Sequence, residues 1–183
     1  MKGTTHLIVG IAAASAVSKY TGNDFGVTEM IIAGIGSLLL DIDDDSSTIN
    51  KYIPFSYKKL IYGIMGLYLL YYSHTTKSMI LLLPAVLSML IYLSGHRGFT
   101  HSIAACVLFS LIFYKTQSYL IIFLLCEILH LICDMFNTKG LRLLYPSSKR
   151  YRMPMHASMN SLVGRLMEMG ITAIAILIYI KTI

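Results

Sequence analysis

Charged residues are scarce in this chain. Lys, Arg, Asp and Glu make up 13% of its 183 residues, whereas 56% of residues are hydrophobic and the mean hydropathy is +0.67. An average soluble domain carries about 25% charged residues, so this composition points to a membrane protein. The length suffices for one domain. We therefore predict a single membrane-embedded domain over residues 1–183.

Cysteine is also scarce, and its positions argue against thiol chemistry. Cys106, Cys126 and Cys133 each lie inside an apolar run, where a free cysteine behaves as a small buried hydrophobe. No C-x-x-C pair is present, which disfavours a thiolate zinc site. We expect no disulfide partner.

Further absences narrow the function classes. The sequence has no repeat at a fixed period. It also has no His-Glu-x-x-His motif, and this absence disfavours a membrane metalloprotease or amidase. His6 interrupts the first apolar run, so we expect no cleaved signal peptide. The net charge of +6 could suit nucleic acid, but the basic residues cluster in loops beside apolar segments. A lipid bilayer is therefore the expected partner, and nucleic acid is not.

Apolar segments fill most of the chain and predict an all-α polytopic fold of five to seven helices. Spanning a hydrocarbon core of ~30 Å takes about 17–25 helical residues, a length that only the fourth, sixth and seventh segments reach comfortably. The others suit interfacial, re-entrant or shielded helices. The segments cover residues 6–18, 28–40, 60–73, 79–94, 102–114, 118–136 and 162–181.

Alternation of these segments across the membrane places every candidate ligand on one side. The same side receives 11 of the 15 Lys and Arg, whereas Lys19, Lys77, Lys115 and Lys181 fall on the other. By the positive-inside rule, the N-terminus and the site are predicted to be cytoplasmic in a plasma (inner) membrane, with the C-terminus outside. The 11 are Lys2, Lys51, Lys58, Lys59, Arg97, Lys139, Arg142, Lys149, Arg150, Arg152 and Arg165.

The end of the sixth segment carries the strongest chemical signal. His130 and Asp134 are four residues apart, so a helix presents both side chains on one face. A charged side chain within a bilayer costs about 2.5–3.5 kcal/mol and needs a partner. A divalent metal is the most economical one, and His with Asp suits zinc or manganese. Glu127, one turn earlier, is a candidate to support these ligands.

Other polar residues at segment ends are candidates for the same metal centre. Asp41 directly follows an apolar run and Asp43 comes next, whereas Asp44 and Asp45 suit a solvated loop. His6 is a candidate ligand or a helix-start histidine bonded to backbone. Glu168 lies inside the last segment, where it could either bind the metal or form a hydrogen bond between helices. His156 suits a solvated position.

The loop from His96 to Ser102 holds two imidazoles on either side of Gly98, which allows a sharp turn. One imidazole can bind metal while the other binds a second metal or acts as an acid. Arg97 suits a phosphate or carboxylate, or anchors the loop at the membrane surface. Thr100 or Ser102 can cap the next helix.

Several motifs together resemble the YdjM-type membrane-bound metal-dependent hydrolases. They are Thr4-Thr5-His6, Leu40-Asp41-Ile42-Asp43, the block from His96 to Ser102, and His130-x-x-x-Asp134 followed by Thr138-x-Gly140 and Leu143-Leu144-Tyr145-Pro146. Leu40 stands where the family usually has proline. That family is in turn similar to the zinc-dependent phospholipases C and the single-strand-specific zinc nucleases.

The resemblance implies that His6, Asp41, His101, His130 and Asp134 bind metal, with His96 competing for the place of His101. For the later ligands of the soluble relatives only Glu168 and His156 are available, so one or two ions are expected. The resemblance implies a phosphoesterase, and the hydropathy favours a lipid or polyprenyl phosphate as its substrate. Arg97 is then expected to hold the phosphate and His96 to act as acid. Alternatives are an ion transporter and a structural metal site.

Overall fold

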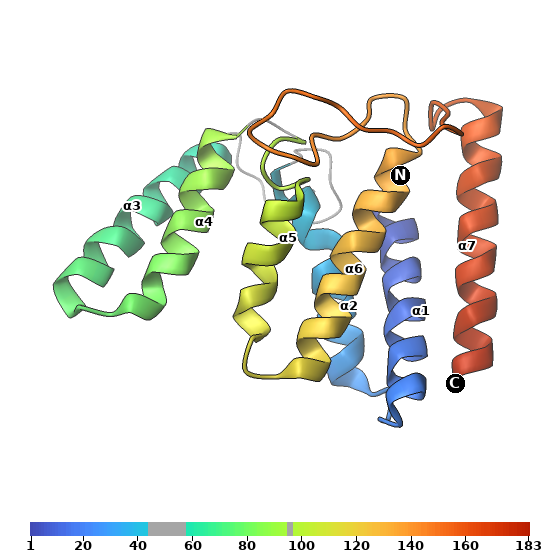
Figure 1. Ribbon diagram of the computed structural model, residues 1–183, viewed down its shortest axis with the longest axis horizontal. Helices are drawn as coiled ribbons and strands as arrows, with labels where there is room; N and C mark the ends of the chain where they lie inside the picture. The colour runs from blue at the N-terminus through green and yellow to red at the C-terminus, as the bar shows by residue number, and fades with distance from the viewer. Residues whose placement is uncertain (44–57, 95–96) are drawn as a thin grey trace.

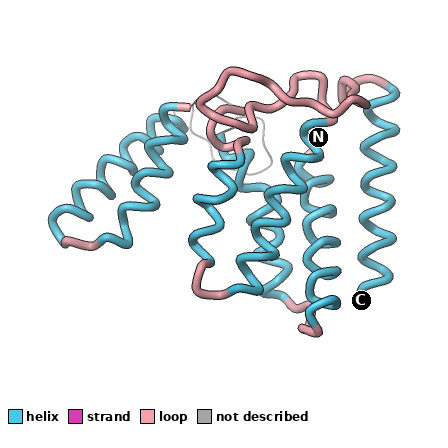
Figure 2. Tube along the Cα trace, viewed as in Figure 1, coloured by secondary structure: helices cyan, strands magenta, loops and turns pink. Residues whose placement is uncertain are grey.

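The computed structural model describes residues 1–43, 58–94 and 97–183, and within these ranges the chain is all-helical with no β-strand (Figures 1 and 2). Each predicted apolar segment forms one α-helix, which confirms the all-α prediction. The short 3-10 helices are η1 (Leu39–Asp43), η3 (Met79–Leu81) and η4 (Leu111–Phe113). The α-helices are α1 (Gly3–Thr21), α2 (Val27–Leu38), α3 (Lys58–Thr76), α4 (Leu82–Leu93), α5 (Ile103–Ser110), α6 (Gln117–Met135) and α7 (Leu162–Thr182).

By length and composition, α6 with 19 residues and α7 with 21 are the candidate membrane spans in the described part of the chain. The prediction that segment 79–94 also approaches this length is wrong. Its α-helix, α4, has 12 residues, or about 18 Å at 1.5 Å per residue. Pro84 lies in the first turn of α4, where its missing N–H removes no hydrogen bond, and the preceding residues form η3 instead.

The helices form a bundle with a hairpin beside it (Figure 1). Helix α6 packs against α1, α2 and α5, while α7 packs on α1. Helices α3 and α4 pack mainly on each other and stand to one side of the bundle. Small buried residues such as Ala14 and Ala33 allow close approach of the helices around Phe123.

One end of the bundle gathers the starts of α1, α5 and α7, the end of α6, and η1 (Figure 1). The chain from α6 to α7 crosses this end and is held there by backbone hydrogen bonds, among them Met153 N–H to Met135 O and Ala157 N–H to Phe136 O. The helix ends that carry the candidate ligands therefore lie together, as the alternating arrangement predicts. The cytoplasmic orientation of this end stays a prediction.

Gly36 on α2 is expected to be intolerant of a side chain. A Cβ atom there would lie 3.0 Å from Phe123 O and 3.2 Å from Cys126 Cβ, both on α6. Gly36→Ala should therefore lower the free energy of unfolding by about 1–3 kcal/mol. Gly34→Ala is the matched control, because its Cβ would only reach Leu7 Cδ1 at 3.5 Å. Thermal unfolding in detergent measures both, and equal melting temperatures would contradict the close contact of α2 with α6.

Candidate metal centre

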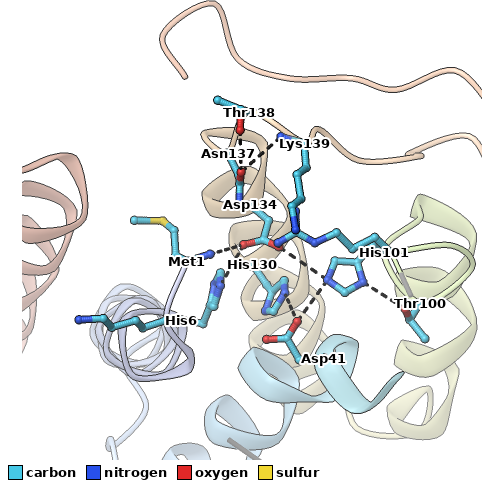
Figure 3. A network of polar contacts seen from close by, with 12 residues as sticks. Met1, His6, Asp41, Thr100, His101, His130, Asp134, Asn137, Thr138 and Lys139 are labelled. Carbon is cyan, nitrogen blue, oxygen red and sulfur yellow. Dashed lines mark hydrogen bonds and ion pairs between the residues drawn. The ribbon is translucent and has the colours of Figure 1, made fainter. Parts of the chain in front are cut away.

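Four side chains that suit a metal ion meet at this end of the bundle. Asp41 on η1, His101 before α5, and His130 and Asp134 on α6 place one ligand atom each within 4.8 Å of all the others (Figure 3). The two histidines and Asp134 are almost fully buried, whereas the Asp41 side chain is 16% exposed. Three separate parts of the chain thus form the group, and all four residues are among the predicted ligands.

The distances within the group fit the ligand shell of a small cation. Asp41 Oδ1 lies 3.3 Å from His101 Nε2 and 3.6 Å from His130 Nε2. Asp134 Oδ2 lies 3.8 Å from His101 Nε2. Two tetrahedral ligands, each about 2.0–2.2 Å from a zinc ion, are about 3.4 Å apart. The spacing of the nitrogen and oxygen atoms therefore suits an ion between them.

The tautomer of His130 follows from its partner on α2. Its Nδ1 lies 2.7 Å from Ser37 O, and a carbonyl oxygen can only accept, so Nδ1 carries the proton. In the neutral imidazole, Nε2 then presents its lone pair toward Asp41 Oδ1. This buried Nε2 makes no hydrogen bond to any residue that the structure describes. A donor bond from the other ring nitrogen to a backbone carbonyl is the usual arrangement of a histidine that binds metal.

A hydroxyl relay sets the tautomer of His101. Thr100 Oγ1 donates its proton to Asp43 Oδ2 at 2.8 Å, so it must accept from His101 Nδ1 at 3.1 Å. The lone pair of His101 Nε2 is thereby directed at Asp41 and Asp134. Thr100 is free for this task because Ser102, not Thr100, caps α5 by accepting from the Ala105 N–H.

Lone pairs of two neutral imidazoles and two carboxylates thus converge, and a group of this kind could hold a metal cation. Nitrogen and oxygen donors of this kind suit zinc, with manganese as an alternative.

Thr100→Val should weaken metal binding by about 10–100-fold, because it removes the hydroxyl that orients His101 while keeping the shape of the side chain. Thr100→Ser keeps the hydroxyl and should bind like the wild type. Zinc titration against a competing chelator measures both affinities. Equal affinity of the valine and serine variants would show that the relay does not position His101.

Asp134 is also the meeting point of three other groups. Its Oδ1 lies 2.7 Å from the Met1 ammonium and 3.2 Å from His6 Nε2 (Figure 3). Its Oδ2 lies 3.0 Å from Arg97 Nη2. The His6 ring stacks on His130 with centroids 3.9 Å apart. His6 therefore lies against the four-residue group through both Asp134 and His130.

The guanidinium of Arg97 also lies beside Asp134, and only part of its hydrogen-bonding capacity is used there. Its Nη2 contacts Asp134, but Nε and Nη1 are buried without a hydrogen-bond partner among residues 1–43, 58–94 and 97–183. Its backbone adopts a left-handed conformation with φ 58°, which is uncommon for a residue other than glycine. The guanidinium therefore retains two buried donors beside the group of ligands.

The remaining predicted residues have other partners. Asp43 binds Thr100, as described, and Glu168 Oε1 accepts from the Lys2 N–H at 2.8 Å and the Thr5 hydroxyl at 2.9 Å. Glu168 thus joins α7 to the start of α1, which matches the hydrogen-bond alternative. Glu127 accepts a hydrogen bond from the Ser110 hydroxyl on α5 at 3.1 Å.

His156 is the remaining predicted residue that the structure describes, and its Nδ1 lies 2.9 Å from Met153 O. His96, Asp44 and Asp45 lie outside the described residues. The sequence did not indicate the roles of Thr100 and of Ser37 O. Thr100 adjoins His101 in the sequence and offered a signal, whereas a backbone carbonyl such as Ser37 O offers none.

Sequence comparisons agree with the resemblance. The relative described as "Uncharacterized protein YvsG", from Bacillus subtilis (strain 168), is 29% identical over 179 residues, which cover 94% of this chain and 90% of YvsG. The protein YfhP of the same organism, described in the same way, is 37% identical over 71 residues, or 33% of this chain and 22% of YfhP. No solved structure matches. The wider similarity to zinc phospholipases C and nucleases stays a prediction.

The family model described as "YdjM inner membrane protein" matches residues 1–182. This match spans almost the whole chain and includes every residue of the four-residue group. The chain therefore belongs to the YdjM inner membrane protein family.

Proposed function

We propose that this protein is a membrane-embedded, metal-dependent hydrolase that cleaves phosphate esters of lipids. The observation that carries the proposal is the convergence of Asp41, His101, His130 and Asp134, whose ligand atoms lie within 4.8 Å of one another. The group found in the described residues accommodates one ion, with zinc as first choice and manganese as second. When bound, the ion would supply Lewis-acid activation of water and of a phosphoryl oxygen.

The buried donors of Arg97 support a phosphate ester as the substrate. Nε and Nη1 of Arg97 have no hydrogen-bond partner among the described residues, and an always-charged guanidinium donates readily to phosphate oxygens. Asp134 contacts the third nitrogen, Nη2, and so fixes the direction of the guanidinium. Arg97 would therefore bind a non-bridging phosphate oxygen next to the ligand group through a single N–H donor.

The hydropathy of the chain supports a lipid as the rest of the substrate. The ligand group lies at one end of apolar helices, two of which are long enough to cross a membrane. A substrate whose phosphate sits at this end and whose chains lie between or beside the helices needs no passage through water. An acyl phospholipid and a polyprenyl phosphate both meet this description.

The test is hydrolysis by the purified full chain in detergent. The protein is stripped with chelator, reloaded with zinc or manganese, and given phosphatidic acid, phosphatidylglycerol, a polyprenyl phosphate, or the water-soluble diester bis(p-nitrophenyl) phosphate. We expect cleavage of at least one ester that disappears with chelator, returns with metal, and is absent in Asp41→Asn. Failure of the loaded protein to cleave any of them would contradict the proposal.

A structural metal site is the second candidate, because Asp134 and both histidines are almost fully buried. The two candidates differ in whether a position at the ion is open to an exogenous ligand. Cobalt-substituted protein should change its visible spectrum on addition of inorganic phosphate if the site is catalytic. An unchanged spectrum would favour the structural role.

A further inference from the structure

An apolar groove runs along the outer side of the bundle between α1, α6 and α7. Its volume is about 650 Å³, and its lining is almost entirely hydrocarbon. Alanine side chains on α1, among them Ala12, Ala13 and Ala16, leave the space that larger residues would fill. Facing them are Leu125 and Leu129 of α6 and, from α7, Ile171, Ile174, Ala175 and Ile178.

One end of the groove lies at the same end of the bundle as the candidate metal centre. Val9 is its first residue on α1 and lies one turn after His6, while Leu129 on α6 adjoins His130 in the sequence. On α7, Ile171 lies one turn after Glu168. An elongated molecule in the groove would therefore have its polar end at the end of the bundle that holds the ligand group and Arg97.

The length of the groove matches one leaflet of a bilayer. From Val9 to Tyr20, α1 rises about 17 Å at 1.5 Å per residue. Half of a hydrocarbon core of ~30 Å is about 15 Å. A single acyl chain of a leaflet lipid would fill this distance, whereas a polyprenyl chain of many isoprene units would extend well beyond it.

We propose that this groove binds one acyl chain of a glycerophospholipid whose phosphate lies at Arg97 and the metal centre. The inference rests on the proposed function and makes its substrate specific: an acyl phospholipid, with selection by chain length. Positions along α1 then act as a ruler. Ala13 and Ala16 lie about 6 Å and about 10 Å beyond Val9, so a large side chain at either position would shorten the chain that fits.

The test uses a dipalmitoyl phosphatidic acid that carries a photoactivatable diazirine near the end of one acyl chain. The full-length protein is loaded with zinc in detergent, irradiated with this probe, and the labelled peptides are mapped by mass spectrometry. In the wild type we expect labels at the far end of the groove, near Tyr20 and Ile178. Each methylene kept out of an apolar site lowers affinity about fourfold.

Three variants decide the outcome. Ala16→Phe should move the label toward Val9. It should also make dioctanoyl phosphatidic acid as good a competitor as the dipalmitoyl lipid. Ala13→Phe should shorten the preferred acyl chain further, and Ala13→Leu is used in its place if the Ala13→Phe protein does not fold. Ala173→Phe is the matched control, because Ala173 is exposed on α7 outside the groove, and it should leave label and competition unchanged.

Labels spread over the outer faces of α3 and α7 with no shift in the variants would overturn the inference, since the probe would then report bilayer contact alone. Crosslinks between the α1 helices of two copies would overturn it too, in favour of a dimer. The proposed function is separable, because hydrolysis of bis(p-nitrophenyl) phosphate needs no groove. If this diester is cleaved but the labelling does not shift in the variants, only the proposed binding of an acyl chain in the groove is contradicted. If the labelling shifts but no ester is cleaved, only the proposed hydrolase activity is contradicted.

Discussion

Replacing His130 with alanine is expected to lower metal affinity by more than about 100-fold. His130 supplies one of the four converging donors, and its ring is fixed by Ser37 O on one side and stacked on His6 on the other. Loss of a residue that only orients a ligand typically costs 10–100-fold, so loss of the ligand itself should cost more. Elemental mass spectrometry of the detergent-purified protein measures the bound metal.

Two further variants make this result interpretable. Asp41→Asn keeps the size of a second ligand but removes its charge, so it should also lose metal even if His130→Ala folds poorly. His74→Ala is the histidine control, because His74 is exposed near the end of α3. Stoichiometric metal in both ligand variants, with native helix content by circular dichroism, would show that the ion binds elsewhere.

The second large effect is expected at Arg97. Arg97→Ala should retain metal but lower kcat/KM for the phosphate ester by about 10²–10³-fold, the usual cost of removing one donor that stabilises developing charge. Arg97→Lys should recover only part of this rate, because an ammonium keeps the charge without the planar fork. The measurements are steady-state kinetics and metal content on the same samples.

Arg165 provides the control for charge at the same end of the molecule. It is exposed in the first turn of α7 and bonds to Asn160 O, so Arg165→Ala removes one positive charge without touching the ligand group. We expect unchanged kinetics for this variant. An equal loss in the Arg97 and Arg165 variants would mean that overall positive charge, and not the placed guanidinium, matters for the substrate.

Hydrophobic patterning predicted the helices well. All seven apolar segments became α-helices with boundaries within a few residues, except that α4 starts later because of Pro84. The ligand group was also predictable, because alternation alone put the ends of helices carrying Asp41, His101 and His130 at one end. Each of these inferences depends on the order of apolar and polar residues, which the sequence displays directly.

The sequence did not predict which acidic residues join the ligand group and which form hydrogen bonds elsewhere. Asp43 and Asp41 are both carboxylates two residues apart, yet Asp43 bonds Thr100 and Asp41 faces the histidines. The turn of η1 decides between them, and its geometry depends on tertiary packing. Glu168 could equally have been a ligand by its depth in the last segment; its actual partners, Lys2 and Thr5, lie more than 160 residues away in sequence.

The origin of the four donors has a thermodynamic consequence. They come from η1, from the turn before α5 and from α6, which the unfolded chain does not hold together. An ion that binds only the folded protein adds RT ln(1 + [L]/Kd) to its stability, about 2.7 kcal/mol at a free concentration of 100 Kd. The ion would thus act as a removable cross-link between distant parts of the chain, and the supply of metal would set how firmly one end of the bundle stays closed.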